Sequence, residues 1–295
     1  MKDYIIKTTA ANGAMRAYFA TTKNILNKAV KIHNTTPVVS AAFGRMLTGA
    51  AIMGTMLKND SDLMTISIKC EGPLKGMLVT CDNHSVKGYV HNPFVELDLK
   101  ENGKLDVSGA IQEGTLSIVK DIGLKEPYSG KVPLVSGEIA EDLTHYFAVS
   151  EQTPTAVSLG VLVGTDLSIE QSGGFILQML PQADDEIISK VELAIANLPP
   201  VTTLLQDGKT PELIMEILLD GLNPVINEKV EIDYHCNCSK ERAEKALIAV
   251  GLDELYSILK DDKAATLNCP FCNENHRFSE NELSGLIGRL ESGKA

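Results

Sequence analysis

The chain has 295 residues, of which 44% are hydrophobic and 22% are charged, and its net charge is −12. These values are ordinary for a soluble globular protein, and the length suits roughly two domains. The negative charge argues against general nucleic-acid binding and against an anionic membrane surface as a partner, because both interactions need surplus lysine and arginine.

Two stretches bear on where the protein works. Residues 1–7 lack the apolar segment of a signal peptide. The most apolar long run, Val38 to Leu57, is interrupted by Arg45 and is rich in small residues, which is typical of a buried helix rather than a membrane span. We therefore expect a cytoplasmic protein with reduced thiols.

Cys70 and Cys81 stand in strand-like runs, where we expect buried, unreactive thiols.

Residues 1–180 predict an α+β domain with a mixed sheet, since several strands follow one another without intervening helices. Ala11-Asn12-Gly13 marks a tight turn between two strands, and Thr36-Pro37 marks the start of a long helix. Residues 123–137, rich in glycine and proline, are expected to form a loop. The expected elements are strands at 4–9 and 14–22, a helix at 36–57, short strands within 63–121, a helix at 138–151, and strands at 157–163, 167–171 and 175–180.

The composition changes after residue 180. From Gln182 to Ile232, ten acidic residues and three lysines give a charge of −7. The hydrophobic pattern predicts two short helices, one ending at Pro199 and one beginning at Thr210. Such helices are only marginally stable alone, and like charge opposes compaction. We therefore predict a helical acidic linker at 181–232 that depends on docking, although an ordinary helical subdomain fits this pattern equally well.

Residues 233–295 form the third predicted part, a small domain with a weak core. Ser239 is expected to cap one helix, and Ser279 with Glu282 forms a capping box for a final helix. These roughly 60 residues carry few large apolar side chains, and a domain of this size usually needs a structural metal.

Four cysteines in this last part form two motifs, Cys236-Asn-Cys238 and Cys269-Pro-Phe-Cys272, with 30 residues between them. Each motif presents two thiolates to one point. Four thiolates are the ligand set of a closed structural zinc site, at Zn–S distances of about 2.3 Å. We therefore predict one Zn²⁺ per chain, bound by the four cysteines. His235 and His276 are substitute ligands that the four cysteines make unnecessary.

Thiolates are also the groups that oxidants attack. The two thiols of each motif can close a local disulfide, which takes away the donors of the metal. Loops this short return little chain entropy, whereas a metal contributes about 10–16 kcal/mol to small zinc modules. Oxidation should therefore unfold this domain.

A catalytic thiol is the main alternative. Cys269-Pro-Phe-Cys272 is similar to the Cys-Pro-Tyr-Cys motif of glutaredoxins, which would make the protein a thiol–disulfide oxidoreductase. In that family, however, the motif lies near the start of a βαβ unit, and here it lies far downstream. The chain has no G-x-x-x-x-G-K-[ST], G-x-S-x-G or H-E-x-x-H motif, so we predict neither an enzyme nor an ATP-driven protein. A constitutive zinc-stabilised binding protein is a third possibility.

Several stretches carry a family resemblance along nearly the whole chain. They are the two cysteine motifs, with Ser239-Lys-Glu-Arg242 after the first, Asn92-Pro-Phe-Val-Glu-Leu97, residues 123–142, and Ser150-Glu-Gln-Thr-Pro154. In these stretches the chain resembles the heat-shock-protein-33 family of redox-regulated molecular chaperones.

The resemblance implies an ATP-independent holdase that acts under oxidative stress. In that family the reduced, zinc-bound protein is inactive, and oxidants drive formation of the Cys236–Cys238 and Cys269–Cys272 disulfides with release of zinc. The zinc domain and the linker then unfold, and the protein can form a homodimer and bind unfolding client proteins. By this resemblance, residues 1–180 bind clients and dimerise, residues 181–232 are the metastable linker, and residues 233–295 sense the oxidant.

Overall fold

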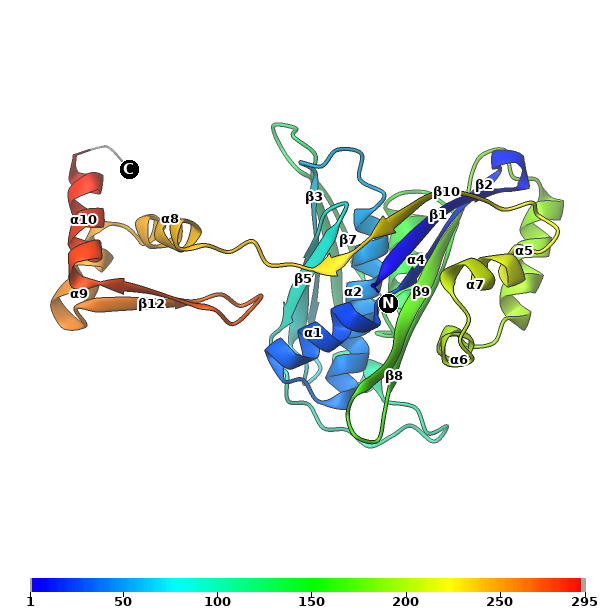
Figure 1. Cartoon of the computed structure of the whole chain (residues 1–295), viewed down its shortest axis with the longest axis horizontal. Helices are drawn as coiled ribbons and strands as arrows, with labels where there is room; N and C mark the ends of the chain where they lie inside the picture. The colour runs from blue at the N-terminus through cyan, green and yellow to red at the C-terminus, as the bar shows by residue number, and fades with distance from the viewer. Residues whose placement is uncertain (1, 293–295) are drawn as a thin grey trace. The chain divides into compact units, whose positions relative to one another are not determined.

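The computed structural model describes residues 2–292 (Figure 1). These residues divide into two compact units, the first ending at His235 and the second beginning at Cys236. The first unit combines strands and helices, which confirms the α+β class. Its elements are β1 (Tyr4–Ala10), η1 (Ala11–Gly13), β2 (Met15–Thr21), α1 (Lys23–His33), α2 (Pro37–Gly54), β3 (Leu63–Cys70), β4 (Gly76–Cys81), β5 (Ser85–Val90), α3 (Val107–Ile111), β6 (Gly114–Asp121), β7 (Tyr128–Pro133), α4 (Ala140–Val149), β8 (Thr155–Val163), β9 (Ile169–Met179), α5 (Asp185–Asn197), α6 (Val201–Gln206), α7 (Pro211–Leu218), β10 (Val225–Glu231) and β11 (Asp233–Tyr234).

Two sheets form the framework of the first unit. The five-stranded sheet has the order β10-β1-β2-β9-β8, and the six-stranded sheet has the order β11-β5-β4-β3-β6-β7. Neighbouring strands of the five-stranded sheet are antiparallel, while β11 lies parallel to β5 in the other sheet. The turn predicted between β1 and β2 is present, and Asn12 and Gly13 adopt the positive φ angles of 55° and 87° that such a turn needs.

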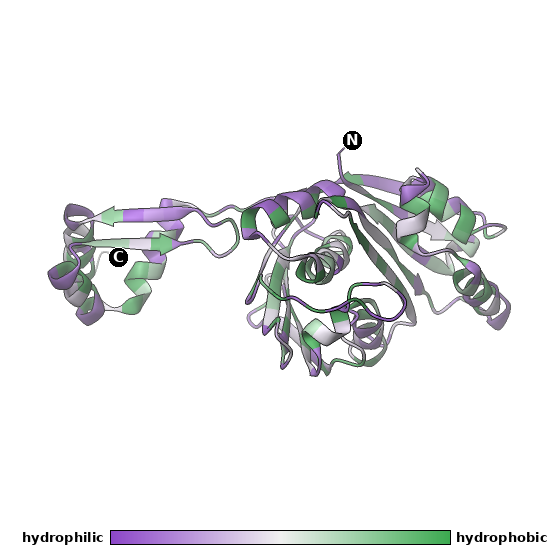
Figure 2. Cartoon of the chain, turned by 90° about the horizontal axis from the view of Figure 1, so that it is seen from below, coloured by the Kyte–Doolittle hydropathy of each residue, from purple (hydrophilic) through white to green (hydrophobic). Residues whose placement is uncertain are grey.

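Helix α2 is the central element of this unit. It contacts β8 and β9 of one sheet and β4 and β5 of the other, and Figure 2, which looks along the helix, shows it between the two sheets. Small residues allow this close packing. A Cβ atom on Gly44 would lie 2.4 Å from Leu26 Cδ2, and one on Gly54 would lie 2.3 Å from the carbonyl oxygen of Asp82.

The start and the burial of α2 match the prediction. Thr36 is its N-cap residue and Pro37 occupies its first turn. By length and composition the helix could cross a membrane, but 89% of its residues are buried within the protein. It is the core helix that its small residues predicted.

The outer face of the five-stranded sheet is covered by the acidic linker. Alternate residues of the strands point to opposite sides, so Ile5 joins the core around α2 whereas Ile6 and Phe19 join a second core with linker residues. Helix α6 contacts β8 and β9, α7 contacts β1 and β2, and α5 contacts α7. We call this second core the linker core; its buried members are Tyr4, Ile6, Ala10, Met15, Ala17, Phe19, Phe175, Leu177, Val191, Val201, Leu204, Leu205, Ile214, Met215, Leu218, Leu219 and Leu222.

The linker is helical at first, as predicted, but its last part is a strand. Residues 225–231 form β10, which pairs antiparallel with β1 from Thr9↔Val225 to Tyr4↔Glu231. The short helix α6 between the two predicted helices was also not foreseen. On α7, the predicted apolar face is only half buried, since Leu213 is 41% and Ile217 45% exposed.

Two predictions for stretches that contain glycine were wrong. Residues 123–137 are not a loop throughout, because Tyr128–Pro133 form the edge strand β7 paired with β6; an edge position tolerates a terminal proline because no second neighbour needs its N–H. The strands expected at 167–171 and 175–180 are one strand, β9. Its Gly174 does not end the strand but allows close approach, since a Cβ there would lie 2.3 Å from the carbonyl oxygen of Ser158.

Two further helices of the first unit were missed. The stretch 63–121 was expected to contain only strands, but Val107–Ile111 form α3, whose N-cap Asp106 accepts a hydrogen bond of 2.9 Å from the N–H of Gly109. Helix α1 follows β2 directly, and its N-cap Thr22 makes no side-chain capping bond. Helix α3 has a capping residue but only five residues, and α1 is longer but has no capping bond, so neither combines a start signal with a long apolar period.

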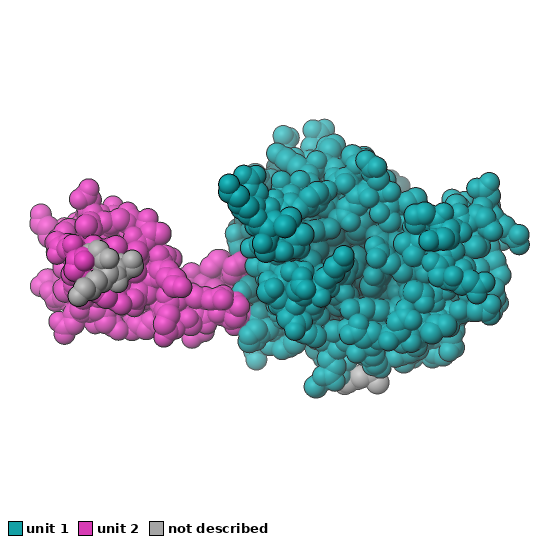
Figure 3. Space-filling view, turned by 90° about the horizontal axis from the view of Figure 1, so that it is seen from above, with its two compact units in different colours: residues 1–235 teal, residues 236–295 magenta. Residues whose placement is uncertain are grey.

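The second unit is coloured magenta in Figure 3. Its elements are α8 (Lys240–Val250), α9 (Leu252–Asp261), β12 (Ala264–Asn268), β13 (Asn275–Ser279) and α10 (Glu280–Glu291). Ser239 caps α8 by accepting a bond of 3.3 Å from the N–H of Arg242, and the Ser279–Glu282 capping box starts α10, both as predicted. Among the described residues of this unit, the buried apolar core consists of Leu247, Leu255, Phe278, Leu283, Leu286 and Ile287.

Candidate metal centre

The two cysteine motifs lie in two non-helical segments of the second unit. Cys236 and Cys238 immediately precede α8, while Cys269 and Cys272 lie in the turn that joins β12 to β13. Backbone bonds fix this turn, because the N–H of Cys269 donates to the carbonyl of Glu274 and the N–H of Asn273 donates to the carbonyl of Cys269, both at 2.8 Å. Asn273 has φ of 58°, a left-handed conformation that asparagine tolerates well.

The structure brings the four predicted cysteines together. Their Sγ atoms all lie within 4.8 Å of one another, and each side chain is half-buried. The Cys236–Cys269 Sγ distance is 3.7 Å and the Cys238–Cys272 distance is 3.3 Å. A tetrahedron with Zn–S bonds of about 2.3 Å has S–S edges of about 3.8 Å. The cluster therefore has the donor type, number and spacing for one metal ion.

The shortest sulfur contacts run between the motifs and not within them. Cys236 approaches Cys269 and Cys238 approaches Cys272, and all four thiols are free. This arrangement is expected of four ligands around one centre, because a metal bound here would tie the segment before α8 to the β12–β13 turn.

The protein environment shifts the pKa values of three of these thiols in different directions. Burial opposes ionisation of Cys269, but hydrogen bonds from the backbone N–H of Phe271 and from Cys272 outweigh it, so the pKa of Cys269 lies below its ordinary value. Burial raises the pKa of Cys238 and of Cys272. Because metal ligation requires thiolates, binding a cation here releases protons.

Two further residues adjoin the cluster. A ring nitrogen of His276, a carboxylate oxygen of Glu274 and the Sγ of Cys238 lie within 4.8 Å of one another. Sequence reasoning considered His276 only as a substitute ligand and did not consider Glu274. The signal for His276 was its alternation with Phe278 in β13, which places both on the inward face. Among residues 2–292, His235 belongs to neither group of possible ligands.

The other two cysteines lie in the first unit. Cys81 is buried, as predicted, and Cys70 is half-buried. Burial raises the pKa of both thiols, so both are largely protonated and weakly nucleophilic near neutral pH.

Comparison with known proteins identifies the family and agrees with the fold. The sequence model of the family described as Hsp33 protein matches residues 3–279. The 33 kDa chaperonin of Clostridioides difficile (strain 630) is 50% identical over 292 residues, covering 98% of this chain and 100% of that protein. The 33 kDa chaperonin of Acetivibrio thermocellus is 46% identical over 296 residues and is covered completely.

A solved structure gives the same result. The crystal structure of the 33 kDa chaperonin (heat shock protein 33 homolog) of Thermotoga maritima matches with a TM-score of 0.90 and 35% sequence identity, covering 99% of this chain and 100% of that one. The resemblance stated from the motifs is thereby confirmed, and the chain belongs to the Hsp33 family of chaperones.

Proposed function

We propose that this chaperone is a redox-regulated, ATP-independent holdase whose sensor is the cluster of Cys236, Cys238, Cys269 and Cys272. The observation that carries the proposal is the convergence of four free thiols within 4.8 Å in a unit whose described core has six buried apolar residues. So small a core rarely holds a domain together without a cross-link or a metal.

In the reduced protein, the four thiolates would bind one Zn²⁺. When bound, the ion supplies a structural cross-link between the segment before α8 and the β12–β13 turn. The cysteines then hold the two segments together and keep the β12–β13 hairpin packed against the helices of the unit. We take this form to be inactive toward clients.

Oxidation removes the donors. Each cysteine pair, Cys236–Cys238 and Cys269–Cys272, would give up two electrons to an oxidant such as a peroxide, which is reduced to water, and would form one S–S bond. Zinc is bound by the negatively charged thiolate. A disulfide sulfur carries no such charge and is therefore a far weaker ligand. Without the metal, the six-residue core does not outweigh the conformational entropy of the unit, which unfolds.

The linker is the element that would respond to this unfolding. It ends shortly before Cys236 in the chain, and its residues 182–232 carry a charge of −7. Because short helices are marginally stable and like charges repel, these helices depend on docking through the linker core. Undocking would uncover Ile6, Phe19 and Phe175 on the sheet. Exposed apolar surface of this kind binds the apolar segments of unfolding proteins.

Roles and partners follow from this scheme. Residues 1–180 would bind clients and form a homodimer after oxidation, residues 181–232 would be the metastable linker, and residues 233–295 the redox sensor. The partners would be unfolding proteins in the cytoplasm. The net charge of −12 disfavours nucleic acid and anionic membranes as partners.

Aggregation of a heated client protein, followed by light scattering with and without prior peroxide treatment, tests the proposal. The proposal expects suppression by the oxidised protein and none by the reduced protein. A constitutive binding protein would suppress aggregation equally in both states. A thiol–disulfide oxidoreductase using Cys269 and Cys272 would instead turn over a disulfide substrate with glutathione or thioredoxin.

A further inference from the structure

The edge strands of the first unit differ in how well they are protected. An exposed strand edge offers unpaired N–H and C=O groups to any other chain, and proteins usually block it with charge, with proline or by keeping the strand very short. Strand β10 carries two glutamates and a lysine, β7 carries a lysine and a terminal proline, and β11 has only two residues. The fourth edge strand, β8, has neither a charged residue nor a proline among its nine residues.

The space beside β8 is also open. Among the residues described, 155–163 make backbone hydrogen bonds to β9 and to no other segment. A register shift between Leu162 and Val163 interrupts this pairing only near the end of the strand. A cavity of about 640 Å³ borders residues 158–165, so no described residue fills the space along this part of the edge. Ligand sites typically have volumes of about 300–1,000 Å³.

The cavity is a groove with an inner and an outer wall. The inner wall consists of one face of α2 and a loop, with Pro37, Ala41, Arg45, Leu99 and Leu105. The outer wall is the start of linker helix α6, residues 200–203. A Cβ atom on Gly160 of β8 would lie 2.6 Å from Thr202 Cγ2, so this helix lies directly on the strand. Release of the linker would therefore open the groove on its outer side.

The charged residues that line the groove, Arg45 and Lys104, are both cations. Nη1 of Arg45 pairs with Glu138, but its Nε is buried and has no hydrogen-bond partner among the residues described. Lys104 is exposed. In a chain with a net charge of −12, these two cations favour an occupant with a negative charge, while the leucine and valine side chains of the groove favour one that is otherwise apolar.

We propose that the edge of β8 binds one extended segment of an unfolding client protein by strand addition. The segment is largely apolar and carries an acidic side chain that reaches Lys104. Backbone hydrogen bonds to β8 supply affinity for any sequence, and the groove selects the side chains. The inference rests on the client-binding role of residues 1–180 in the proposed function, and it adds a site at the edge of the five-stranded sheet to the one on its outer face.

A second copy of the chain fits this edge less well than an unfolded segment does. Pairing of two β8 strands around a two-fold axis would press the walls of both grooves together and would bring the two Lys104 side chains near each other. Like charges at close range oppose such pairing. An unfolded segment has no walls of its own and can enter the groove as a single strand.

The test uses the full-length oxidised protein, in which the proposed function releases the linker. The probe is a fluorescent, end-blocked peptide of alternating valine and threonine with one glutamate near its C-terminus, and binding is followed by fluorescence anisotropy. Two versions of the peptide carry N-methyl groups on one edge or on the other. Methylation of one edge should lower the affinity by more than about tenfold, because several backbone bonds are lost together, while methylation of the other edge should have little effect. This comparison needs no protein variant.

A charge swap locates the acidic side chain. Lys104→Glu should weaken binding of the glutamate peptide by roughly threefold to tenfold, as expected for reversal of one exposed charge pair. The same variant should prefer a peptide in which lysine replaces the glutamate. Lys125→Glu makes the same charge change at another exposed position and should do neither.

A second pair of variants locates the strand. Ser158→Lys places a lysine on the β8 edge, which is how exposed edges are usually blocked, and should lower peptide affinity. Thr9→Lys makes a matched change at another half-buried hydroxyl residue, on β1, whose edge is uncovered if β10 leaves it. This variant should bind the peptide as the wild type does.

Three results would overturn the proposal. Equal affinity for the two methylated peptides would do so, because adsorption on apolar surface needs no backbone bonds. Loss of binding in Thr9→Lys but not in Ser158→Lys would place the added strand at β1. If the peptide does not bind and Ser158→Lys turns an oxidised dimer into a monomer in sedimentation, a second copy is the occupant. The proposed function survives all three results, and it fails instead if the oxidised protein does not suppress client aggregation.

Discussion

The hydroxyl of Tyr4 on β1 donates a hydrogen bond of 2.7 Å to Glu212 Oε2 on α7, which ties a linker helix to the five-stranded sheet. Lys229 on β10 donates to the other oxygen of Glu212 at 2.9 Å, and its Nζ lies 3.7 Å from the Tyr4 ring centroid. One carboxylate thus joins three elements of the docked linker. Burial opposes its charge, but the hydrogen bonds from Tyr4 and Lys229 outweigh burial and lower the pKa of Glu212 to about 2.

Glu212→Gln should therefore loosen the linker. A lowered carboxyl pKa contributes stability that is fully present above the ordinary value of 4.5 and is lost as the pH falls through about 2. At neutral pH the variant forfeits the whole contribution, which we expect to be about 1 kcal/mol for bonds to a partly exposed charge. Hydrogen exchange of α7 in the reduced protein measures it. Glu216→Gln, at an exposed position on the same helix, is the control, and equal protection in the two variants would contradict this account.

Replacing any one of the four clustered cysteines with serine should weaken zinc binding by more than about tenfold and loosen the second unit under reducing conditions. The reason is that the six-residue core cannot compensate for a missing ligand. Zinc affinity and protease resistance of residues 236–292 measure the effect. Cys70→Ser, in the first unit, should leave both unchanged. A cluster variant with wild-type affinity and protease resistance would rule out the metal as the support of this unit.

Disulfide formation should begin at Cys269 and Cys272, because the longer spacing closes a less strained ring than Cys236-Asn-Cys238 does. Mass mapping of disulfides after brief peroxide treatment would show the order. Early accumulation of Cys236–Cys238 would contradict it. The sulfur contacts of 3.7 Å and 3.3 Å run between the motifs, so a predominance of Cys236–Cys269 or Cys238–Cys272 would overturn the proposed pairing altogether.

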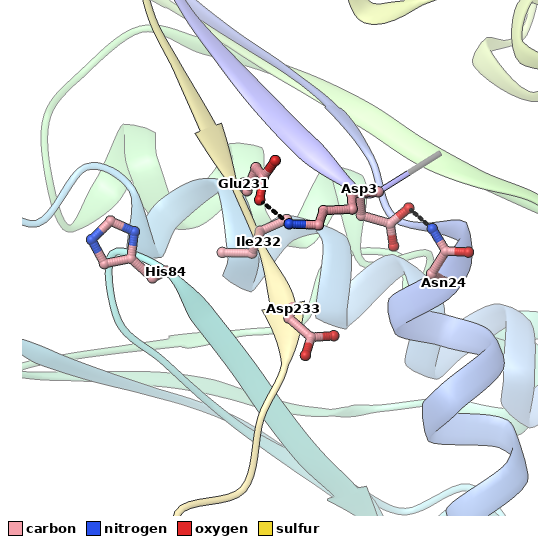
Figure 4. A pocket seen from close by; sticks show the side chains of 7 residues that line it. Asp3, Asn24, His84, Glu231, Ile232 and Asp233 are labelled. Carbon is pink, nitrogen blue, oxygen red and sulfur yellow. Dashed lines mark hydrogen bonds and ion pairs between the residues drawn. The ribbon is translucent and has the colours of Figure 1, made fainter.

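Asp3 should make the first unit less stable as the pH rises from 4 to 6. Its carboxylate points toward Asn24 (Figure 4) and accepts bonds from Asn24 Nδ2 at 2.9 Å and from the N–H of Ile25 at 2.7 Å. Burial outweighs these bonds and raises the pKa of Asp3 from 3.8 to about 6. The folded protein therefore holds a proton that the unfolded chain has already lost, so this contribution is present below pH 3.8 and disappears as the pH rises through 6.

Asp3→Asn removes this dependence. The difference in unfolding free energy between variant and wild type should shift in favour of the variant by about 3 kcal/mol at most between pH 4 and 7, as measured by denaturant titration at each pH. Subtracting the wild type cancels the other titrating groups. Asp98→Asn, at an exposed position, should show no such trend, and a flat difference for Asp3→Asn would refute the assignment.

The sequence predicted best what depends on local chemistry. The caps at Ser239 and Ser279 begin helices because a capping residue acts within its own turn. Pro37 marks the first turn of α2, whose N-cap Thr36 makes no side-chain capping bond. The cysteine cluster could be predicted for a similar reason. Each short motif presents two thiolates from one stretch of backbone, so only the meeting of the two motifs depends on the fold.

What the sequence did not reveal depends on distant partners. β10 is a strand because β1, more than 200 residues earlier, offers a free edge. The alternation of Val230, Ile232 and Tyr234 with polar residues was the local signal that could have indicated it. Residues 172–174 were not expected to belong to a strand, because their partners at 159–161 in β8 are recognised only in the fold. The sequence did not predict that Glu274 and His276 lie beside Cys238, because this proximity depends on the register of the β12–β13 hairpin.

The central claim is that loss of the metal opens the protein to its clients. The most direct test follows zinc release and client light scattering together, in one sample of reduced, zinc-loaded protein after addition of peroxide. Suppression of aggregation should rise in step with released zinc and disappear when a reductant and zinc are restored. Full suppression before any zinc is released, or complete release with no suppression, would contradict it.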